Sequence, residues 1–280
     1  MQVITLTSDI GHKDFLTGAI KGCLLKINTS FNICDISHNV DAFDVNQAAY
    51  LLKSAYQYFP ENTWHLVFIN LFDYAGCSLI LAKWNGQFFA CPDNYLLPLV
   101  FENEPMEMVR IKVPADANVT EWARIMGNAI NYFNNGVPFE KLGDPVTDIR
   151  QKNALKPSVS EQHIDGSVLY VDNYDNVITN ISKVDFENAR KGRDFVIVFK
   201  GNETIEKLSD NYASVPQNNK LAYFNTAGYL EIAINKGSAS KLFGLKSNYN
   251  LVNDGSLSEG MLSARMFYSK IRIDFKNATE

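Results

Sequence analysis

"QVITLTSDIGHKDFLTGAIKGCLLKIN" (residues 2–28) holds, in one short segment, the two patterns that decide the fold. Its first part is a β-rich run that ends at Ser8 and Asp9 and leads into a turn at Gly11. Apolar residues then recur with helical spacing at Phe15, Ala19, Leu24 and Leu25. The segment therefore predicts a strand, a turn and a helix.

The same alternation continues through the first half of the chain. Residues 32–37 and 64–70 are further β-rich runs, and an amphipathic helix pattern begins near Asp44 between them. A later helix pattern covers residues 119–136 and ends at a glycine. Strands that alternate with helices of this length pair in parallel through crossovers. We therefore expect an α/β domain with a doubly wound, mostly parallel sheet.

The second half of the chain changes character. Residues 141–163 are polar, contain two prolines and show no steady periodicity, which is typical of a linker. Beyond it, β-rich runs separated by Gly, Asn and Asp turns lie at residues 166–181, 193–201, 220–234 and 268–275. This pattern predicts an all-β barrel or sandwich. The expected domains are thus residues 1–150 and 160–280.

The composition limits the class of protein. Among the 280 residues, 46% are hydrophobic and 20% are charged, which is typical of a folded, soluble protein. The net charge is -5 and the basic residues are scattered, so we expect no nucleic-acid partner. The chain shows no secretory signal and no apolar run near the ~20 residues of a membrane helix. The four cysteines lack metal-type spacing, so we expect reduced thiols, no metal site and a cytoplasmic location.

Polar residues follow the predicted parallel strands at their carboxyl ends, where ligands gather in this class of fold. They are Asp9, Ser37, His38, Asn70 and the segment 90–94. Asp9 either accepts hydrogen bonds from a sugar diol or caps the helix that follows. The residues around it do not form a G-x-G-x-x-G fingerprint, so dinucleotide binding is not expected.

The second half offers two further polar features. Asp172, Asp175, Asn176 and Asn180 surround an apolar core, either as turn residues or as ligand contacts. Glu231 lies inside an apolar strand pattern and needs a partner or a solvent-facing side. The histidines lack the flanking signatures of a Ser-His-Asp hydrolase, and phosphate loops are absent. The residues alone indicate a polar pocket but no substrate.

Six segments, taken together and in this order, carry a resemblance to a known family. They are "ITLTSDIG", "DFLTGAIKGCLLKIN", "ICDISHNVDAFDVNQAAYLL", "FACPDNYLLPLVF", "VLYVDNYDNVITNI" and "LEIAINKGSASKLFGL". With them the chain resembles the SAM hydroxide adenosyltransferase family of adenosine-forming SAM hydrolases, which is related to the SAM-dependent fluorinase and chlorinase.

The resemblance implies an architecture and a ligand site. It implies an N-terminal α/β domain, a C-terminal β-barrel, and a homotrimer that binds SAM between the N-terminal domain of one subunit and the C-terminal domain of its neighbour. SAM is then substrate or ligand, and no cofactor is expected. Asp9 matches the acid that holds the ribose hydroxyls, and Asp172 and Asn176 match the motif at the methionine end. The segment that approaches the adenine contains Asn235, Gly237 and Ser238.

The implied chemistry is displacement at the ribose C5′ of SAM by water or hydroxide, which releases methionine and leaves adenosine. Family members are thought to position the nucleophile with an Asp, an Arg and a His, and this chain departs from that pattern. Asn70 stands at the aspartate, Cys77 or Ser78 at the arginine, and Glu121 near the histidine. Asp73 and Glu121 are the candidates for substitute carboxylates, one of them as general base.

Three hypotheses follow. The first is a SAM hydrolase with altered or weak activity. The second is a catalytically inactive module that binds SAM or adenosine. The third is a scaffold for a protein partner, in which Phe72 and Tyr74 fill the space where water should sit.

Overall fold

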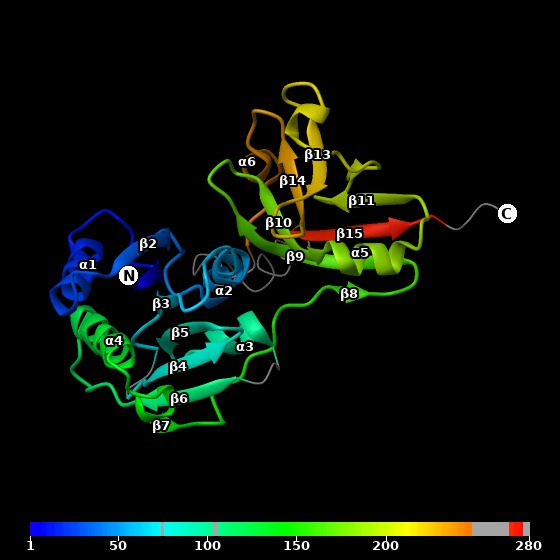
Figure 1. Cartoon of the computed structure of the whole chain (residues 1–280). Coiled ribbons are helices and arrows are strands. Elements are labelled where there is room, and N and C mark those ends of the chain that lie inside the picture. The colour runs from blue at the N-terminus through cyan, green and yellow to red at the C-terminus, as the bar shows by residue number, and fades with distance from the viewer. Residues whose placement is uncertain (74–75, 103–105, 248–268, 277–280) are drawn as a thin grey trace. The chain divides into compact units, whose positions relative to one another are not determined.

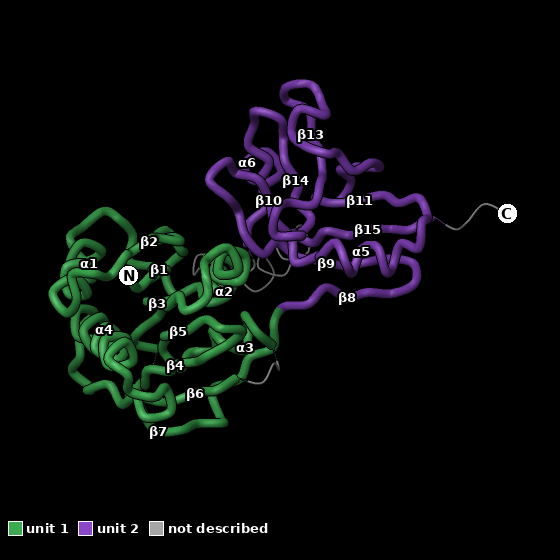
Figure 2. Tube along the Cα trace, viewed as in Figure 1, with its two compact units in different colours: residues 1–154 green, residues 155–280 purple. Residues whose placement is uncertain are grey.

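The computed structural model describes residues 1–73, 76–102, 106–247 and 269–276 (Figure 1). Tyr74 lies outside these described residues, so its predicted role in blocking the pocket is not seen. The chain divides into two compact units, residues 1–154 and residues 155–280 (Figure 2). Each unit has its own sheet and its own hydrophobic core.

The first unit is built on a seven-stranded sheet of order β2-β1-β3-β5-β4-β6-β7. Its strands are β1 (Val3–Ser8), β2 (Asn32–Ser37), β3 (Trp64–Phe68), β4 (Leu79–Trp84), β5 (Gln87–Pro92), β6 (Glu107–Ile111) and β7 (Asp144–Pro145). Strands β2, β1, β3 and β5 are parallel, whereas β4 is antiparallel to both β5 and β6. The prediction of an α/β domain with a mostly parallel sheet is confirmed.

Helices cover both faces of this sheet. One face packs against α1 (Leu16–Ile27) and α4 (Val119–Asn134), and the other against α2 (Val45–Ala55) and α3 (Leu96–Phe101). The 3-10 helices are η1 (Tyr56–Tyr58) and η2 (Phe139–Lys141). Side chains of β3 alternate between the two cores, with Leu66 and Phe68 in one and Val67 in the other. A strand buried on both faces is apolar throughout, as the run at residues 64–70 is.

The second unit is an antiparallel sheet of order β12-β11-β15-β9-β10-β14-β13, with β8 paired to β9. Its strands are β8 (Ser158–Val159), β9 (His163–Val171), β10 (Val177–Ser182), β11 (Phe195–Phe199), β12 (Glu203–Ile205), β13 (Lys220–Phe224), β14 (Tyr229–Ile234) and β15 (Lys270–Phe275). Its helices are α5 (Lys183–Arg190), η3 (Tyr212–Ser214) and α6 (Ala239–Phe243).

This sheet curls almost into a barrel. The end strands β12 and β13 lie against each other, and Lys220 Nζ lies 2.6 Å from Glu203 Oε2 across the seam between them. A core of aliphatic and aromatic side chains from the strands and from α5 and α6 fills the interior. The prediction of a β-rich second half is confirmed: it is an antiparallel sheet that is nearly barrel-shaped, with the helices α5 and α6 added to it.

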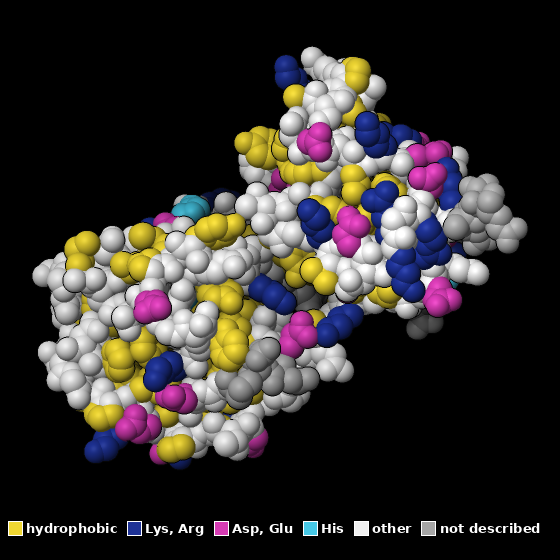
Figure 3. All heavy atoms as spheres, turned by 45° about the vertical axis from the view of Figure 1, so that its right-hand side comes forward, with side chains coloured by type: hydrophobic (Ala, Val, Ile, Leu, Met, Phe, Trp, Pro, Cys, Tyr) yellow, Lys and Arg dark blue, Asp and Glu magenta, His cyan; other side chains and the backbone are white. Residues whose placement is uncertain are grey.

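The surface mixes both signs of charge. On the face shown in Figure 3, basic and acidic side chains lie interspersed over the second unit. Asp165 illustrates the mixing, because Arg272 and Lys270 both pair with it, at 2.7 Å and 2.9 Å. Among the described residues, no helix combines the length and the apolar character needed to cross a membrane.

Candidate functional site

Asp9 follows β1 at the carboxyl edge of the parallel sheet. Its Oδ2 accepts hydrogen bonds from the backbone N–H groups of Phe43, at 2.9 Å, and Asn70, at 3.2 Å. The N-cap residue of α1 is Phe15, and the side chain that bonds to the first turn of that helix is Asp14, whose Oδ1 accepts from the N–H of Leu16 at 2.9 Å. Asp9 is therefore not a helix cap, and its half-buried carboxylate is instead held between the loops that follow β2 and β3.

Asn70 and Asp73 extend this polar group along the turn after β3. Asn70 has a left-handed φ of 45°, and its Nδ2 donates to Asp73 Oδ1 at 2.8 Å. Arg150 Nη1 donates to the other carboxylate oxygen, Oδ2. Asp9, Asn70, Asp73 and Arg150 thus form one continuous chain of hydrogen bonds and an ion pair, which we call the carboxylate–guanidinium chain.

Arg150 belongs to the segment that the sequence predicts as a linker. Its guanidinium lies 4.3 Å above the ring of Tyr95 and donates to the Tyr95 hydroxyl. Its backbone N–H donates to Asp93 Oδ1 at 2.9 Å, and Arg110 Nη2 donates to Asp93 Oδ2 at 3.1 Å. These contacts fix the end of the first unit over the carboxyl edge of its sheet. Sequence reasoning missed Arg150, because a single arginine in a polar segment carries no local signal.

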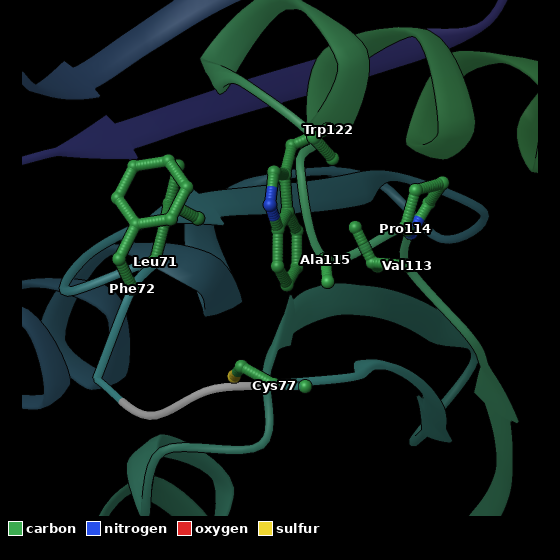
Figure 4. Close-up of a pocket in the computed structure, with 9 residues that line it drawn as sticks. Leu71, Phe72, Cys77, Val113, Pro114, Ala115 and Trp122 are labelled. Atoms are coloured by element: carbon green, nitrogen blue, oxygen red, sulfur yellow. The ribbon is translucent and has the colours of Figure 1, made fainter.

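A cavity of about 160 Å³ lies beside the same turn. In Figure 4, Trp122 reaches from α4 between Leu71 and Phe72 on one side and a neighbouring loop on the other, with Cys77 below. The lining residues are Leu71, Phe72, Gly76, Cys77, Val113, Pro114, Ala115, Ala117 and Trp122. None of them carries a charge, although the resemblance places the family's arginine at Cys77 or Ser78. Phe72 is largely exposed even though it lines this cavity.

Glu121, the other predicted carboxylate, lies in the first turn of α4. Arg124 Nε donates to its Oε2 at 2.9 Å, and this hydrogen bond lowers the pKa of Glu121 below its usual value. Glu121 does not line the cavity, whereas its neighbour Trp122 does. The structure therefore brings Asn70 and Asp73 together, whereas Glu121 is bonded to Arg124.

Ser8 and His38 join the carboxyl ends of β1 and β2. Ser8 Oγ lies 2.6 Å from His38 Nδ1, and His38 Nε2 lies 3.1 Å from Asp35 Oδ1. Burial lowers the pKa of His38, so its imidazole is neutral at pH 7. Ser8 is fully buried, and its hydroxyl is engaged by the His38 ring. This serine, histidine and aspartate hold two strands together and are not a hydrolase triad.

The predicted residues of the second unit fall on two neighbouring turns. Asp172 and Asn176 belong to the β9–β10 turn, where Asp172 Oδ1 accepts from the backbone N–H of Asn176 at 2.8 Å and Oδ2 from Asn176 Nδ2 at 3.0 Å. In the same turn, Asp175 accepts from Lys241 Nζ at 2.7 Å, and its backbone oxygen accepts from Ser240 N at 2.8 Å. Lys241 lowers the pKa of Asp175, and a smaller contribution comes from Ser238.

The second turn leads from β14 into α6 and carries Asn235, Gly237 and Ser238. Asn235 Nδ2 donates to Val215 O at 2.7 Å, which anchors the turn within the unit. A Cβ at Gly237 would lie 2.6 Å from Ile234 Cγ2, so only glycine fits there. Together with the contacts of Asp175, this places the two predicted ligand segments of the second unit side by side.

No group of three or more His, Cys, Asp or Glu residues in the described part of the chain is arranged to hold a metal ion. The polar groups that the structure gathers are hydrogen-bond donors and acceptors: carboxylates, amides and a guanidinium. A carboxylate at a strand end, amides in turns and a guanidinium suit a ligand with hydroxyl and amine groups.

Known proteins match both units of the chain. The family model for the SAM hydroxide adenosyltransferase N-terminal domain matches residues 4–143, and that for the C-terminal domain matches residues 166–252. The (R)-S-adenosyl-L-methionine hydrolase of Methanocaldococcus jannaschii is 28% identical over 257 residues, covering 86% of this chain and 92% of that protein. The enzyme of the same name from Thermus thermophilus is 25% identical and covers 88% and 97%.

A solved structure agrees with the fold. The crystal structure of an uncharacterized conserved protein from Thermotoga maritima has a TM-score of 0.78 and 25% sequence identity. The similarity covers 98% of this chain and 100% of that one. Both units of the fold are therefore shared with that protein.

Proposed function

Since the chain belongs to the SAM hydroxide adenosyltransferase family, we propose that it hydrolyses SAM to adenosine and methionine. The observation that carries this proposal is the carboxylate–guanidinium chain, which gathers two acids, an amide and an arginine at the carboxyl edge of the sheet. Relatives named as SAM hydrolases support it as well.

The reaction is a single displacement. The oxygen of water bonds to C5′ of the ribose while the C5′–S bond breaks, and its electron pair goes to sulfur, which becomes the neutral thioether of methionine. The water proton passes to a base and then to bulk solvent. Because sulfonium is a good leaving group, the protein's main task is to hold water in line with the C5′–S bond and to exclude other water.

We assign the ribose to Asp9 and the water to Asp73. Backbone N–H groups of Phe43 and Asn70 hold Asp9 Oδ2, so the carboxylate is already oriented before a diol arrives. Both oxygens of Asp73 are engaged, one by Asn70 and the other by Arg150. A water that binds Asp73 must therefore compete with Arg150, which favours altered or weak turnover.

We further propose that the ligand site is completed by the second unit of a neighbouring subunit in a homotrimer, with Asp172 and Asn176 at the methionine end. The adenine then lies against the turn that carries Asn235, Gly237 and Ser238. This arrangement is the one that the family resemblance implies. Light scattering of the purified protein checks the number of subunits.

One observation favours a second candidate function, a module that binds SAM or adenosine without turnover. The cavity beside the β3 turn is lined by uncharged side chains, with Cys77 at a position where the family resemblance implies an arginine. A protein that keeps Asp9 and the second-unit turns but lacks a cation in this cavity would still bind the adenosyl group.

Turnover in water labelled with ¹⁸O separates the two functions. We expect methionine and adenosine in equal amounts, with ¹⁸O in the 5′-hydroxyl of adenosine.

Asp73→Asn should lower kcat by about 10²–10⁴-fold, the usual contribution of a general base, with little change in the affinity for SAM. The control is Asp194→Asn, which changes an exposed acid of the second unit.

Two outcomes would decide against hydrolysis. Binding of SAM in calorimetry without any adenosine above background would establish the binding module instead. Adenosine formed without ¹⁸O would mean that water does not attack C5′.

A further inference from the structure

The second unit buries an acid on β14 for which the proposed chemistry has no role. Glu231 is 3% exposed and lies in an otherwise apolar strand. Its Oε1 accepts from the Tyr212 hydroxyl at 2.6 Å, and the Tyr223 hydroxyl lies 3.1 Å away. These three residues, Glu231, Tyr212 and Tyr223, are called the acid–phenol cluster below. They supply the partners that an acid in an apolar strand requires.

The cluster is bonded directly to the predicted ligand residues. Asn176 Nδ2 lies 3.2 Å from the Tyr212 hydroxyl and 3.0 Å from Asp172 Oδ2. An amide nitrogen has two hydrogens, and these contacts account for both. Tyr212 has a single hydroxyl hydrogen, which goes to the carboxylate of Glu231 at 2.6 Å, because the Tyr223 hydroxyl, also at 2.6 Å, donates to Tyr212. Donation therefore runs in one direction, from Asn176 to Tyr212 and from Tyr212 to Glu231.

This direction determines how the Asn176 side chain is presented. With Nδ2 held by Asp172 and Tyr212, the carbonyl Oδ1 points away from both. The ligand is then offered an acceptor and must supply a hydrogen-bond donor, which at the methionine end of SAM is the amino group. Were Tyr212 to donate to Asn176 instead, the amide would have to turn, and its nitrogen would leave Asp172.

We propose that Glu231, acting through Tyr212, is a positioning residue that fixes the Asn176 amide for a ligand N–H group. The inference rests on the proposed function, because it takes Asp172 and Asn176 as ligand residues. A site oriented before binding loses less conformational entropy when the ligand arrives. Tyr223 supports the cluster from β13, since its hydroxyl lies 2.6 Å from that of Tyr212, but it has no contact with Asn176 among those described.

The protonation state of Glu231 controls this direction. Burial raises the pKa of Glu231, and the hydrogen bond from Tyr212 opposes that rise. The titratable groups that face it are Tyr212 from η3, Tyr223 from β13 and Asp172 from the end of β9. Once protonated, Glu231 would donate to Tyr212 and no longer accept its hydrogen, so the direction of donation from Asn176 to Tyr212 would no longer be fixed. Ligand affinity should therefore fall as the pH is lowered through the pKa of Glu231.

Calorimetric titration with SAM and with adenosine, from pH 5 to pH 8, tests the proposal. Tyr212→Phe and Glu231→Gln should each weaken the binding of SAM about tenfold at pH 7.5, the effect of one lost hydrogen bond, and should flatten its pH profile. The binding of adenosine, which lacks the methionine end, should stay unchanged in both variants. Tyr223→Phe keeps the Tyr212–Glu231 bond and should change affinity less than about threefold. The controls are the exposed Tyr58→Phe and Glu206→Gln, which should match the unchanged protein.

A second measurement needs no ligand. The side-chain amide signals of Asn176 in NMR spectra, assigned with Asn176→Asp, should shift in Tyr212→Phe and Glu231→Gln but not in the controls. Should Glu231→Gln fail to fold, Tyr212→Phe and Tyr223→Phe still separate a positioning role from a packing role. A packing role would give these two variants equal effects.

The proposal and the proposed function fail in different ways. If the unchanged protein binds neither SAM nor adenosine, the proposed function is wrong. The NMR signals of the Asn176 amide then show by themselves whether Glu231 and Tyr212 orient that amide. If it binds and the folded Tyr212→Phe variant keeps both its affinity and its pH profile, the positioning role is wrong.

Discussion

His65 on β3 has both ring nitrogens bonded inside the sheet. Gln87 Nε2 donates to Phe59 O at 3.0 Å, which turns Gln87 Oε1 towards His65 Nε2 at 2.6 Å. Nε2 must therefore carry the hydrogen, and Nδ1 accepts from Thr5 Oγ1 at 2.7 Å. This neutral tautomer is fully satisfied, and burial lowers the pKa of His65 to about 4. The single imidazole thereby couples folding to pH.

Acid should destabilise the protein through this residue. The unfolded chain binds the His65 proton near pH 6.5 and the folded protein only near pH 4, so stability is lost as the pH falls between these values. The full loss is about 3 kcal/mol. Urea unfolding at pH 7.5, 6 and 5 measures it. His65→Gln should make the dependence shallower and leave the part that is due to His38, whose pKa is also lowered by burial. The exposed His12→Gln removes only a ring contact with His38 and should change the dependence less; equal slopes in both variants would contradict the assignment.

At the scale of elements, α2 depends on its N-cap. Asp44 accepts from the backbone N–H groups of Asn46, at 3.0 Å, and Gln47, at 3.1 Å, as carboxylates do at helix starts. Asp44→Ala should lower the free energy of unfolding by about 1 kcal/mol, whereas Asp44→Ser should retain most of the stability. Thermal unfolding followed by circular dichroism compares them. If Asp44→Ser lowered the free energy of unfolding as much as Asp44→Ala, the loss would come from the changed packing of this buried position and not from the lost cap.

Elements with strong local signals were predictable from sequence, and others were not. The second predicted strand has the bounds of β2, and the helix expected near Asp44 begins at Val45. The β4–β5 hairpin was missed, although its turn is the pair Asn85 and Gly86, both with positive φ, a known hairpin signal. Asn70 and Asp73 were chosen from the strand end together with the family resemblance. Arg150 was not, because its role arises from tertiary contacts with Asp73 and Tyr95.

At the scale of the whole molecule, the hydrophobic cores of the two units share no residue. The two core clusters of the first unit contain residues up to 154, and the core cluster of the second unit contains residues within 164–275. Each unit therefore buries its own apolar surface. The homologous structure from Thermotoga maritima shares both units.

The first unit should fold alone as residues 1–154, with one cooperative thermal transition. A shorter chain, residues 1–147, lacks Arg150 and leaves Asp73 and Asp93 without that partner. Its midpoint should be lower by roughly 2–8 °C, corresponding to about 1–2 kcal/mol at this size. Differential scanning calorimetry measures both. This view would be contradicted if the fragment of residues 1–154 showed no cooperative thermal transition, or if the two fragments had the same transition midpoint.

The hydrogen bond between Asn70 and Asp73 also limits which pairs of side chains this turn can carry. Aspartate tolerates the left-handed backbone at position 70 as well as asparagine does, so the main chain would accept an exchange. It would, however, bring two carboxylates to the 2.8 Å now bridged by an amide, and both cannot stay ionised there without cost. A carboxylate at either of these two positions therefore makes a second carboxylate at the other position costly, unless one of the two is protonated.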